Sequence, residues 1–504
     1  MKKFLLFTLF SMYFLLCIYA QEVAPQTIFI GKIYATEKVI EGQKIDFPQV
    51  IREVGVDYET QWLFLKLQKF NKWGGTLAVY QPFEKQMKWE YPINAHLDQV
   101  LPYPPYIFCS GTKDIKCYDW HTGEVRWTQK GSVAGVYNSV VVLTKSSISS
   151  SLHKVCGVDI QTGKILWERK FNILTGINLY GINDTTVILQ VNGLHAMHIR
   201  TGKGWDYKAM TGGVDLETET PLFRHALLAE SGVGLALGDN DAGSFIRNLS
   251  SGILVDSSDL YWAGRNVIVR LKKDGKVVWE KPLPQDNVSR SGILLKDGII
   301  YMFNYGIAEK GGSFTQIGKP FVAAYRKEDG EQLFCNIAFD EQENMKDFCL
   351  LDTSVCVVYT DRIIKYTFRK GIVEEKVYRQ DSGEKFEFFV ERGIYRKGAD
   401  SLLYDWIAAD TTQKVVYTNR SRFLVLDRDL NLKSMEEQEE MYTEYLHWKN
   451  YRFLYRQGSM YIMDENDKLV AELNVSADSF IVENRLYDVS VNRLIIVDLE
   501  KLSL

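Results

Sequence analysis

The decapeptide YDWHTGEVRW, from Tyr118 to Trp127, has a near copy forty residues later, VDIQTGKILW, from Val158 to Trp167. The two copies share the pattern Asp-x-x-Thr-Gly-x-x-x-Trp. The shared residues are Asp119, Thr122, Gly123 and Trp127 in the first copy and Asp159, Thr162, Gly163 and Trp167 in the second. A phrase that recurs at such an interval indicates a chain built from repeats of one supersecondary unit.

Weaker copies extend this series in both directions. AMHIRTGKGW keeps Thr201, Gly202 and Trp205, and VRLKKDGKVVW keeps Gly275 and Trp279. The motif tryptophans at positions 89, 127, 167 and 205 follow one another at 38, 40 and 38 residues, but the next one in a copy of the motif, Trp279, comes only after 74. We therefore expect a degenerate unit in the interval, around residues 232–252.

Each unit has the composition of short strands joined by tight turns. Runs such as SVVVLTK (139–145), KVCGVDI (154–160) and KILWERKF (164–171) are rich in β-branched and aromatic residues, which favours strands. The Thr-Gly pair supplies the reversal, because glycine accepts positive φ without strain at Cβ. The segment 432–448 is the best candidate for a helix.

A unit of about forty residues with several short strands is typical of a β-propeller blade. We predict an all-β fold, a closed β-propeller of four-stranded blades. About eight blades are expected, with seven or more than eight as alternatives. The early run QTIFIGKIY (26–34) and the final LIIVDL (494–499) are the expected partners that close the ring, since closure removes exposed strand edges.

The repeated phrase resembles the tryptophan-docking motif of the pyrroloquinoline-quinone-type (PQQ-like) β-propellers. The resemblance implies that each tryptophan docks between adjacent blades near the Thr-Gly turn, and that the aspartate supports the turn. It covers residues 75–334 clearly, and residues 335–504 are expected to form degenerate blades. On this resemblance the structural docking residues are Asp119, Thr122, Gly123, Trp127, Asp159, Thr162, Gly163, Trp167, Thr201, Gly202, Trp205, Gly275 and Trp279.

The first twenty residues have the pattern of a secretory signal peptide. Lys2 and Lys3 precede an apolar run from Phe4 to Ile18, and Ala20 offers a cleavage site. A membrane anchor and a lipid attached to Cys17 are the alternatives. We predict export through this segment, to the periplasm or the extracellular space, with the propeller spanning residues 21–504. No later apolar run is long enough for a transmembrane helix.

Export permits disulfide bonds among the six remaining cysteines. A hairpin centred on Lys113 would place Cys109 opposite Cys117. A two-residue turn at Asp352-Thr353 would place Cys349 opposite Cys356. Directly opposed residues of antiparallel strands have the Cα separation that a disulfide needs, but small buried thiols in a β-core are an equally simple explanation.

The sequence assigns no catalytic, cofactor-binding or metal-binding residue, and no cofactor is expected. Quinone dehydrogenases of the PQQ-like type carry a vicinal Cys-Cys pair, and this chain has none. His195 and His198 form the one close histidine pair, but residues three apart on a strand point to opposite faces.

The leading hypothesis is therefore a non-catalytic exported scaffold that binds a protein partner or a component of the cell envelope, as a monomer. A functional analogue with this blade type is the periplasmic propeller lipoprotein of the outer-membrane β-barrel assembly machinery. With a net charge of −4, nucleic acid is not expected as a partner. The alternative is a propeller that binds a carbohydrate, such as a polysaccharide, or a small ligand, including a lyase or hydrolase using the central channel. It rests on the 28 Tyr, 26 Phe and 11 Trp residues. A quinone-dependent dehydrogenase is disfavoured.

Overall fold

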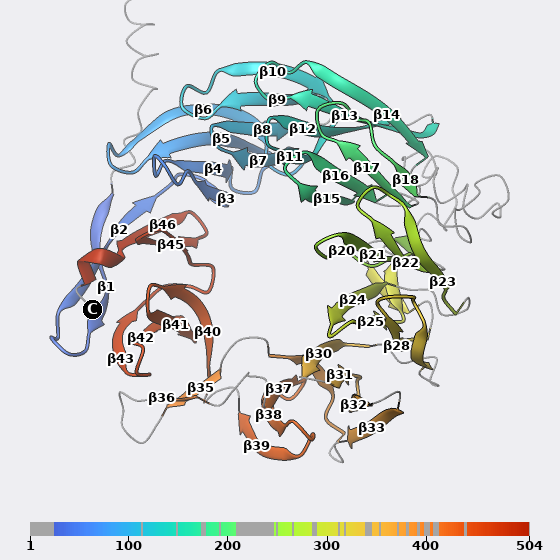
Figure 1. Ribbon diagram of the computed structural model, residues 1–504. Helices are drawn as coiled ribbons and strands as arrows, with labels where there is room; N and C mark the ends of the chain where they lie inside the picture. The colour runs from blue at the N-terminus through green and yellow to red at the C-terminus, as the bar shows by residue number, and fades with distance from the viewer. Residues whose placement is uncertain are drawn as a thin grey trace, which may run out of the picture. The chain divides into compact units, whose positions relative to one another are not determined.

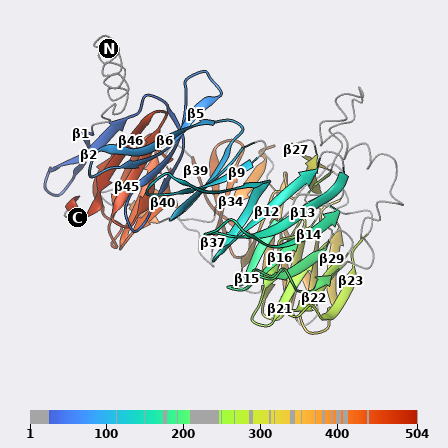
Figure 2. The ribbon, with the colours of Figure 1, turned by 90° about the horizontal axis from the view of Figure 1, so that it is seen from above.

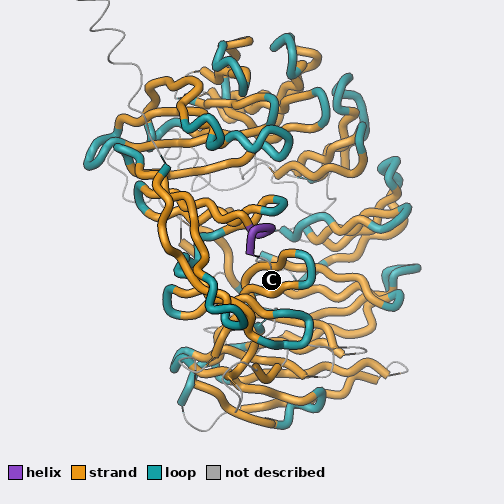
Figure 3. The backbone as a smooth tube through the Cα atoms, turned by 90° about the vertical axis from the view of Figure 1, so that its left-hand side faces the viewer, coloured by secondary structure: helices purple, strands orange, loops and turns teal. Residues whose placement is uncertain are grey.

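The computed structural model describes residues 25–502 with gaps at 112–113, 148–149, 173–177, 191–192, 208–245, 248–249, 265–266, 285–289, 311–312, 317–318, 338–344, 352–353, 370–371, 380–382, 391–393, 398–403, 407–412 and 438–440. The predicted signal peptide and most of the predicted degenerate unit at 232–252 lie outside these residues. Within them the chain is all-β, and the single helical element is the 3-10 turn η4 (Leu499–Leu502). Figure 3 shows it in purple among orange strands. None of the described helices has the length and apolar character needed to span a membrane.

The chain divides into two compact units. Unit 1 comprises Met1–Lys130, Arg392–Ile407 and Glu439–Leu504, and unit 2 comprises Gly131–Glu391 and Ala408–Gln438. We use the word blade for a group of four strands that pair antiparallel in one sheet. In both units the blades are the repeating element (Figure 1).

Unit 2 contains six blades in its described residues. Figure 2 shows several of them, including the strands β12, β13 and β14 side by side. The blades are β11 (Ser132–Tyr137), β12 (Val140–Ser147), β13 (Ser150–Asp159) and β14 (Ile165–Asn172); β15 (Asn178–Asn183), β16 (Thr186–Gln190), β17 (Leu194–His198) and β18 (Asp206–Tyr207); β20 (Leu254–Val255), β21 (Asp259–Ala263), β22 (Val267–Lys272) and β23 (Val277–Pro282); β24 (Ser291–Lys296), β25 (Ile299–Asn304), β28 (Phe321–Arg326) and β29 (Gln332–Ile337); β30 (Asp347–Leu351), β31 (Ser354–Val358), β32 (Arg362–Arg369) and β33 (Ile372–Arg379); and β34 (Phe386–Phe389), β37 (Gln413–Thr418), β38 (Arg422–Asp427) and β39 (Leu432–Glu437).

Unit 2 also contains a small additional sheet. The hairpin of β26 (Ile307–Lys310) and β27 (Ser313–Gln316) interrupts the blade between β25 and β28, and it pairs with β19 (Ile246–Arg247).

Unit 1 contains two separate blades and a sheet of eleven strands. The separate blades are β3 (Val50–Val56), β4 (Leu63–Gln68), β5 (Gly74–Gln81) and β6 (Gln86–Asn94), followed by β7 (Gln99–Tyr103), β8 (Tyr106–Ser110), β9 (Asp114–Asp119) and β10 (Val125–Lys130). The larger sheet runs in the order β36 (Tyr404–Trp406), β35 (Ile394–Lys397), β40 (Met441–Trp448), β41 (Tyr451–Arg456), β42 (Ser459–Met463), β43 (Leu469–Leu473), β1 (Gln26–Ile33), β2 (Val39–Asp46), β46 (Arg493–Asp498), β45 (Arg485–Ser490) and β44 (Phe480–Val482). It therefore holds two more blades, β40–β43 and β44–β46 with β2, joined by β1.

The N-terminal hairpin of β1 and β2 connects these two blades. β1 pairs with β43 through Gly31–Ile33, and β2 pairs with β46 from Gln43 to Asp46. The LIIVDL segment thus pairs with the strand after QTIFIGKIY, which corrects the expected partner. Gly31 is required at the junction, because a Cβ there would lie 1.9 Å from Glu472 O.

The core consists of hydrophobic layers between consecutive blades. In unit 2, one layer joins Val142 of β12 to Leu189 of β16, and four further layers join the later blades in chain order. In unit 1, three layers connect its four blades in the same way. Alternation along each strand places these side chains on one face.

One expectation about secondary structure is wrong. Residues 432–448 contain strands β39 and β40 instead of a helix. Glu437, the last residue of the outer strand β39, forms a cross-strand ion pair with Arg422 at 3.1 Å. The predicted degenerate unit between Trp205 and Trp279 lies mostly outside the described residues, and the described blades on its two sides, β15–β18 and β20–β23, pack directly on each other.

Candidate functional site

The repeated tryptophans bind the turns of neighbouring blades. Each indole N–H donates to a backbone carbonyl in the turn before the fourth strand of the next blade. The bonds run from Trp89 to Trp120 O at 2.8 Å, from Trp167 to Ile199 O at 2.6 Å, from Trp205 to Lys273 O at 2.8 Å and from Trp279 to Lys327 O at 3.0 Å. The bond from Trp205 spans the long interval in the repeat directly.

Glycine in each of these turns makes room for the indole ring. At Gly123, with φ of +74°, a Cβ would lie 2.6 Å from Trp89 Cγ. At Gly202, with φ of +65°, it would lie 2.7 Å from Trp167 Cγ. A Cβ at Gly275 would lie 2.5 Å from Trp205 Cδ2, and a Cβ at Gly330 would lie 2.5 Å from Trp279 Cδ2. Both positive φ and close approach therefore exclude a side chain.

Aspartate caps the turn that accepts Trp89. Asp119 accepts hydrogen bonds from the backbone N–H of His121 at 3.0 Å and of Thr122 at 2.9 Å, and Arg126 Nε donates to it at 3.0 Å. Burial opposes ionisation of Asp119, but these donors more than offset it and hold its pKa below the usual range. This is an Asx-type turn, which stabilises the reversal.

The second copy has the same capping with fewer charges. Asp159 accepts from the N–H and the hydroxyl of Thr162, at 3.0 and 2.9 Å. Burial again opposes ionisation, yet the Thr162 bonds lower the pKa of Asp159. Gly163 has φ of +71°, Thr201 Oγ1 accepts from Lys203 N at 3.4 Å, and Trp127 is buried beside Phe108. All of these residues shape turns and junctions.

The cysteine pairs behave differently from each other. β8 and β9 pair Cys109 with Lys116 and Phe108 with Cys117, so the hairpin register differs by one residue from the expected one. A tight turn closed by Gly111 N and Asp114 O, at 2.9 Å, causes this shift, and it places the two thiols on opposite faces.

Cys349 and Cys356 do lie directly opposite each other on β30 and β31. A hydrogen bond with Cys356, together with burial, raises the pKa of the Cys349 thiol. All six cysteines are free thiols in the structure, and a bond between Cys349 and Cys356 stays a prediction.

The histidine pair lies on β17. His195 is buried, and its Nδ1 lies 2.7 Å from Asp206 Oδ1, whereas His198 is exposed. Burial opposes ionisation of Asp206, but His195 and Arg169 lower its pKa. Across the described ranges, no three His, Cys, Asp or Glu side chains gather where they could hold a metal ion.

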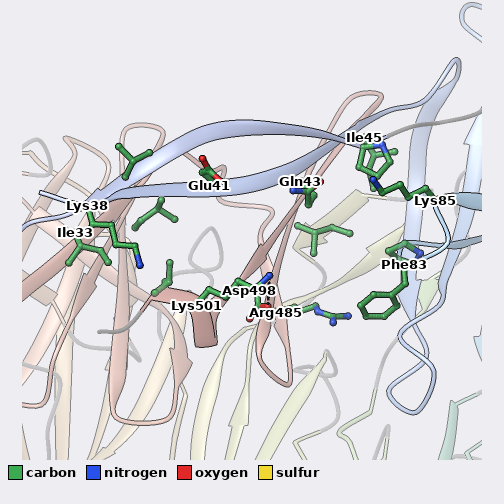
Figure 4. Close-up of a pocket in the computed structure, with 16 residues that line it drawn as sticks. Ile33, Lys38, Glu41, Gln43, Ile45, Phe83, Lys85, Arg485, Asp498 and Lys501 are labelled. Carbon is green, nitrogen blue, oxygen red and sulfur yellow. Dashed lines mark ion pairs between the residues drawn. The ribbon is translucent and has the colours of Figure 1, made fainter. Parts of the chain in front are cut away.

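A pocket of about 640 Å³ lies beneath the β1–β2 hairpin in unit 1. We call it the hairpin pocket. Its lining is drawn from β2, from the β5–β6 turn, and from β45, β46 and η4 (Figure 4). It forms because β2 pairs with β46 only from Gln43 onward. The part of β2 before Gln43 follows β1 toward β43, so β2 and β46 diverge there.

The hairpin pocket has an excess of positive charge. Its ionisable lining residues are Lys38, Glu41, Lys85, Arg485, Asp498 and Lys501. Lys501 lies 3.5 Å from Asp498, and the Arg485 guanidinium lies 4.3 Å from the centre of the exposed Phe83 ring. Within the part of the chain that is described, Lys38 and Lys85 form no ion pair.

One wall of the hairpin pocket is an unpaired strand edge. From Val39 to Gly42, β2 pairs with β1, and its pairing with β46 begins only at Gln43. The backbone groups on the far side of this stretch have no partner strand among the described elements. Such an edge is a ready template for another extended segment.

Sequence reasoning missed the residues of the hairpin pocket. Lys38, Lys85 and Arg485 stand in unrelated parts of the chain and carry no motif. The one sequence expectation that involved this region was that the two ends of the chain pair with each other.

Neither a protein-family model nor a curated protein matches this chain. Solved structures similar to it include BamB from Moraxella catarrhalis, at 13% identity and a TM-score of 0.30, covering 74% of this chain and 96% of BamB. The WD40 domain of SCAP from fission yeast is similar at 9% identity and a TM-score of 0.32, covering 90% and 96%. Sqt1 from Saccharomyces cerevisiae is similar at 6% identity and a TM-score of 0.31, covering 74% and 94%. Likeness at this level does not assign a function.

Proposed function

We propose that this chain is an exported, non-catalytic β-propeller scaffold that binds an extended, acidic segment of a protein partner in the hairpin pocket. In this proposal the blades belong to one ring, in which β2 is the fourth strand of the last blade. The pairing of β2 with β46 supports it. The observation that carries the functional proposal is the unpaired edge of β2 inside a positively charged pocket.

Backbone hydrogen bonds to the unpaired edge of β2 would supply affinity without requiring a particular peptide sequence. A peptide that adds as a strand satisfies its backbone donors and acceptors against Val39–Gly42, while alternate side chains enter the pocket. The apolar part of the lining includes Ile33, Val39 and Leu502, which suits every second residue of such a strand.

The charges select among extended segments. Lys38 and Lys85 lack carboxylate partners in the described structure, and the guanidinium of Arg485 is held in place against Phe83. An acidic segment would supply the missing partners, whereas a basic one would be repelled. Because these groups are largely exposed, their contribution falls with increasing salt.

Binding of defined peptides tests this proposal. The probe is a fluorescein-labelled decapeptide of alternating Glu and Val, and its Lys-Val counterpart is the charge control. Fluorescence anisotropy should show saturable binding of the acidic peptide and at least tenfold weaker binding of the basic one. Absence of saturable binding to the acidic peptide would overturn the proposal.

Two further arms separate strand addition from charge alone. A Glu-Val peptide methylated on alternate backbone nitrogens keeps its charge but cannot complete a ladder, so it should lose binding. Lys85→Glu should weaken binding of the unmodified peptide about tenfold, whereas Lys130→Glu, the same charge change on β10, should leave it within about twofold. Equal binding of the methylated peptide would contradict strand addition.

Export is tested separately. Sequencing the N-terminus of the protein purified from its source should show cleavage after Ala20. An intact Met1 or a lipid on Cys17 would contradict the secreted form that we propose.

A further inference from the structure

A second hollow, of about 290 Å³, lies at the opposite end of the blade β3–β6 from the β5–β6 turn. We call it the Gln68 site. It lies at the β4–β5 turn, and its lining consists of Val50, Arg52, Gln68, Lys69, Phe70, Asn71, Lys72, Trp73 and His96. None of these residues takes part in the hairpin pocket.

The side chain of Gln68 holds the neighbouring residues of this site in place. Its side chain is 5% exposed, its Oε1 accepts a hydrogen bond from Arg52 Nε, and its Nε2 donates to Lys72 O at 2.8 Å. The acceptor on one side and the donor on the other define the amide orientation. The same Nε2 lies 2.8 Å from His96 Nε2, which is therefore the unprotonated ring nitrogen. Arg52 and His96 are thus held in fixed positions.

The lining is cationic and contains no acidic residue. Arg52 lines the hollow and donates to Gln68 through Nε, and its guanidinium has no carboxylate partner among the described residues. Lys69 and Lys72 likewise form no ion pair within the described chain. A planar guanidinium is well suited to a carboxylate.

Two large aromatic side chains stand exposed at the rim. Phe70 is 71% exposed and Trp73 is 66% exposed, although such residues are ordinarily well buried. The Trp73 ring lies 5.5 Å from the His96 ring, measured between centroids. The indole therefore presents a flat apolar face beside the positive charges.

The turn that carries these residues is closely tied to its surroundings. Lys69 N donates to Gly74 O at 3.0 Å, and Ala95 N donates to Trp73 O at 2.9 Å. Gly75 permits this approach, because a Cβ there would lie 2.1 Å from Leu67 O. Arrangement before binding reduces the entropy lost on association.

From this geometry we propose that the Gln68 site binds a uronic-acid unit of an acidic polysaccharide. The carboxylate pairs with Arg52 and the adjacent lysines, and the apolar face of the sugar ring stacks on Trp73. A flat aromatic ring beside a carboxylate-binding fork matches a ring acid better than a flexible acidic peptide. The proposal is independent of the hairpin pocket.

Calorimetric titration of the full-length mature chain tests this inference. The probe is a galacturonic-acid trimer, with a neutral galactose trimer and a pentaglutamate peptide as controls, and the titrations use the Lys85→Glu background, which weakens binding of acidic ligands in the hairpin pocket. The uronate trimer should bind saturably, and both controls should bind at least tenfold more weakly. Failure of the uronate trimer to bind would overturn the proposal.

Variants assign the binding to this site. Arg52→Met and Trp73→Ala should each weaken uronate binding at least tenfold, whereas Lys130→Met should leave it within about twofold. Circular dichroism and the urea midpoint confirm that each variant is folded, and Trp73→Phe, which keeps a ring, should retain most of the affinity. If pentaglutamate binds as tightly as the uronate and Trp73→Ala has no effect, the site takes an acidic protein segment and the sugar assignment is wrong.

Discussion

The blades up to Phe334 and the blades after it use different side chains for the same contact, a hydrogen bond to a turn carbonyl of the next blade. In the earlier blades, an indole N–H donates to a turn carbonyl, as Trp167 does to Ile199 O at 2.6 Å. At the β38–β39 turn the corresponding carbonyl, Arg428 O, accepts instead from Lys365 Nζ. Lys376 adds a bond of 3.2 Å to Asn431 in the same turn.

The turn itself is nearly the same in both regions. Asp427 accepts from the N–H of Asp429 at 2.8 Å and of Asn431 at 2.9 Å, and it caps a turn one residue shorter than that of Asp119. Leu430 occupies the positive-φ position, with φ of +57°, where the earlier turns have glycine. The element common to these turns is therefore a backbone carbonyl that accepts a hydrogen bond from the preceding blade, and tryptophan is one way to supply the donor.

Removing an indole should have the largest effect on this comparison. Trp167→Ala deletes a buried ring and leaves Ile199 O without its donor, so we expect unfolding free energy to fall by about 4 kcal/mol. Urea unfolding followed by far-UV circular dichroism measures it. A loss below about 1 kcal/mol would mean that the indole is not the main contact between these blades.

The glycine opposite the indole should come next. Gly202→Ala combines positive φ with a clash against the Trp167 ring, and we expect a loss of about 3 kcal/mol. Gly383→Ala is the matched control, since its φ is +67° but nothing lies within 4 Å of the added Cβ. That variant should lose only about 1 kcal/mol. Equal losses would show that the backbone conformation alone requires glycine at position 202.

Acid should weaken the capped turns in both regions. Burial opposes the ionisation of Asp119 and of Asp427. The pKa of Asp119 is nevertheless lowered by hydrogen bonds from Arg126 and the turn, and that of Asp427 by bonds that include those from Asn431 and Asp429. A lowered folded-state pKa gives stability that is present above the unfolded value, about pH 4, and is lost as the pH falls through the folded value. Asp119→Asn and Asp427→Asn should each flatten the decline in urea midpoint between about pH 4 and pH 2. An unchanged slope would exclude a role of these caps in acid unfolding.

The lysine junction should show the smallest effect. Lys365→Met keeps most of the packed chain but removes the donor to Arg428 O, which is at a more exposed position than Ile199 O. We expect a loss below about 1 kcal/mol at the urea midpoint. A loss as large as that of Trp167→Ala would mean that the lysine is an equivalent of the indole in energy as well as in geometry.

The sequence predicts what depends on neighbours along the chain. Thr-Gly turns, strand alternation and the spacing of Trp127 and Trp167 are local patterns, so the all-β class follows from them. The late blades are harder, because Leu430 conceals a turn that glycine would reveal. The segment 432–448 was misjudged because charged residues on an outer strand have the composition of a helix.

The candidate sites depend on contacts that no local pattern encodes. The hairpin pocket needs the divergence of β2 from β46, and the Gln68 site needs the 2.8 Å contact between Gln68 and His96. The predicted pairing of Cys109 with Cys117 is wrong for a related reason. A turn that is one residue longer or shorter changes which face of the sheet a side chain occupies.

The pairing of β2 with β46 has a consequence for biosynthesis. Asn492 donates to the carbonyl of Phe47, which is 445 positions earlier in the chain. During translation, the first strands emerge long before the strand that completes their sheet, so for that period their edge is exposed to other chains. The final folding step of unit 1 therefore waits for almost the whole polypeptide, and a chaperone that shields β2 until then would be expected to raise the yield of native protein.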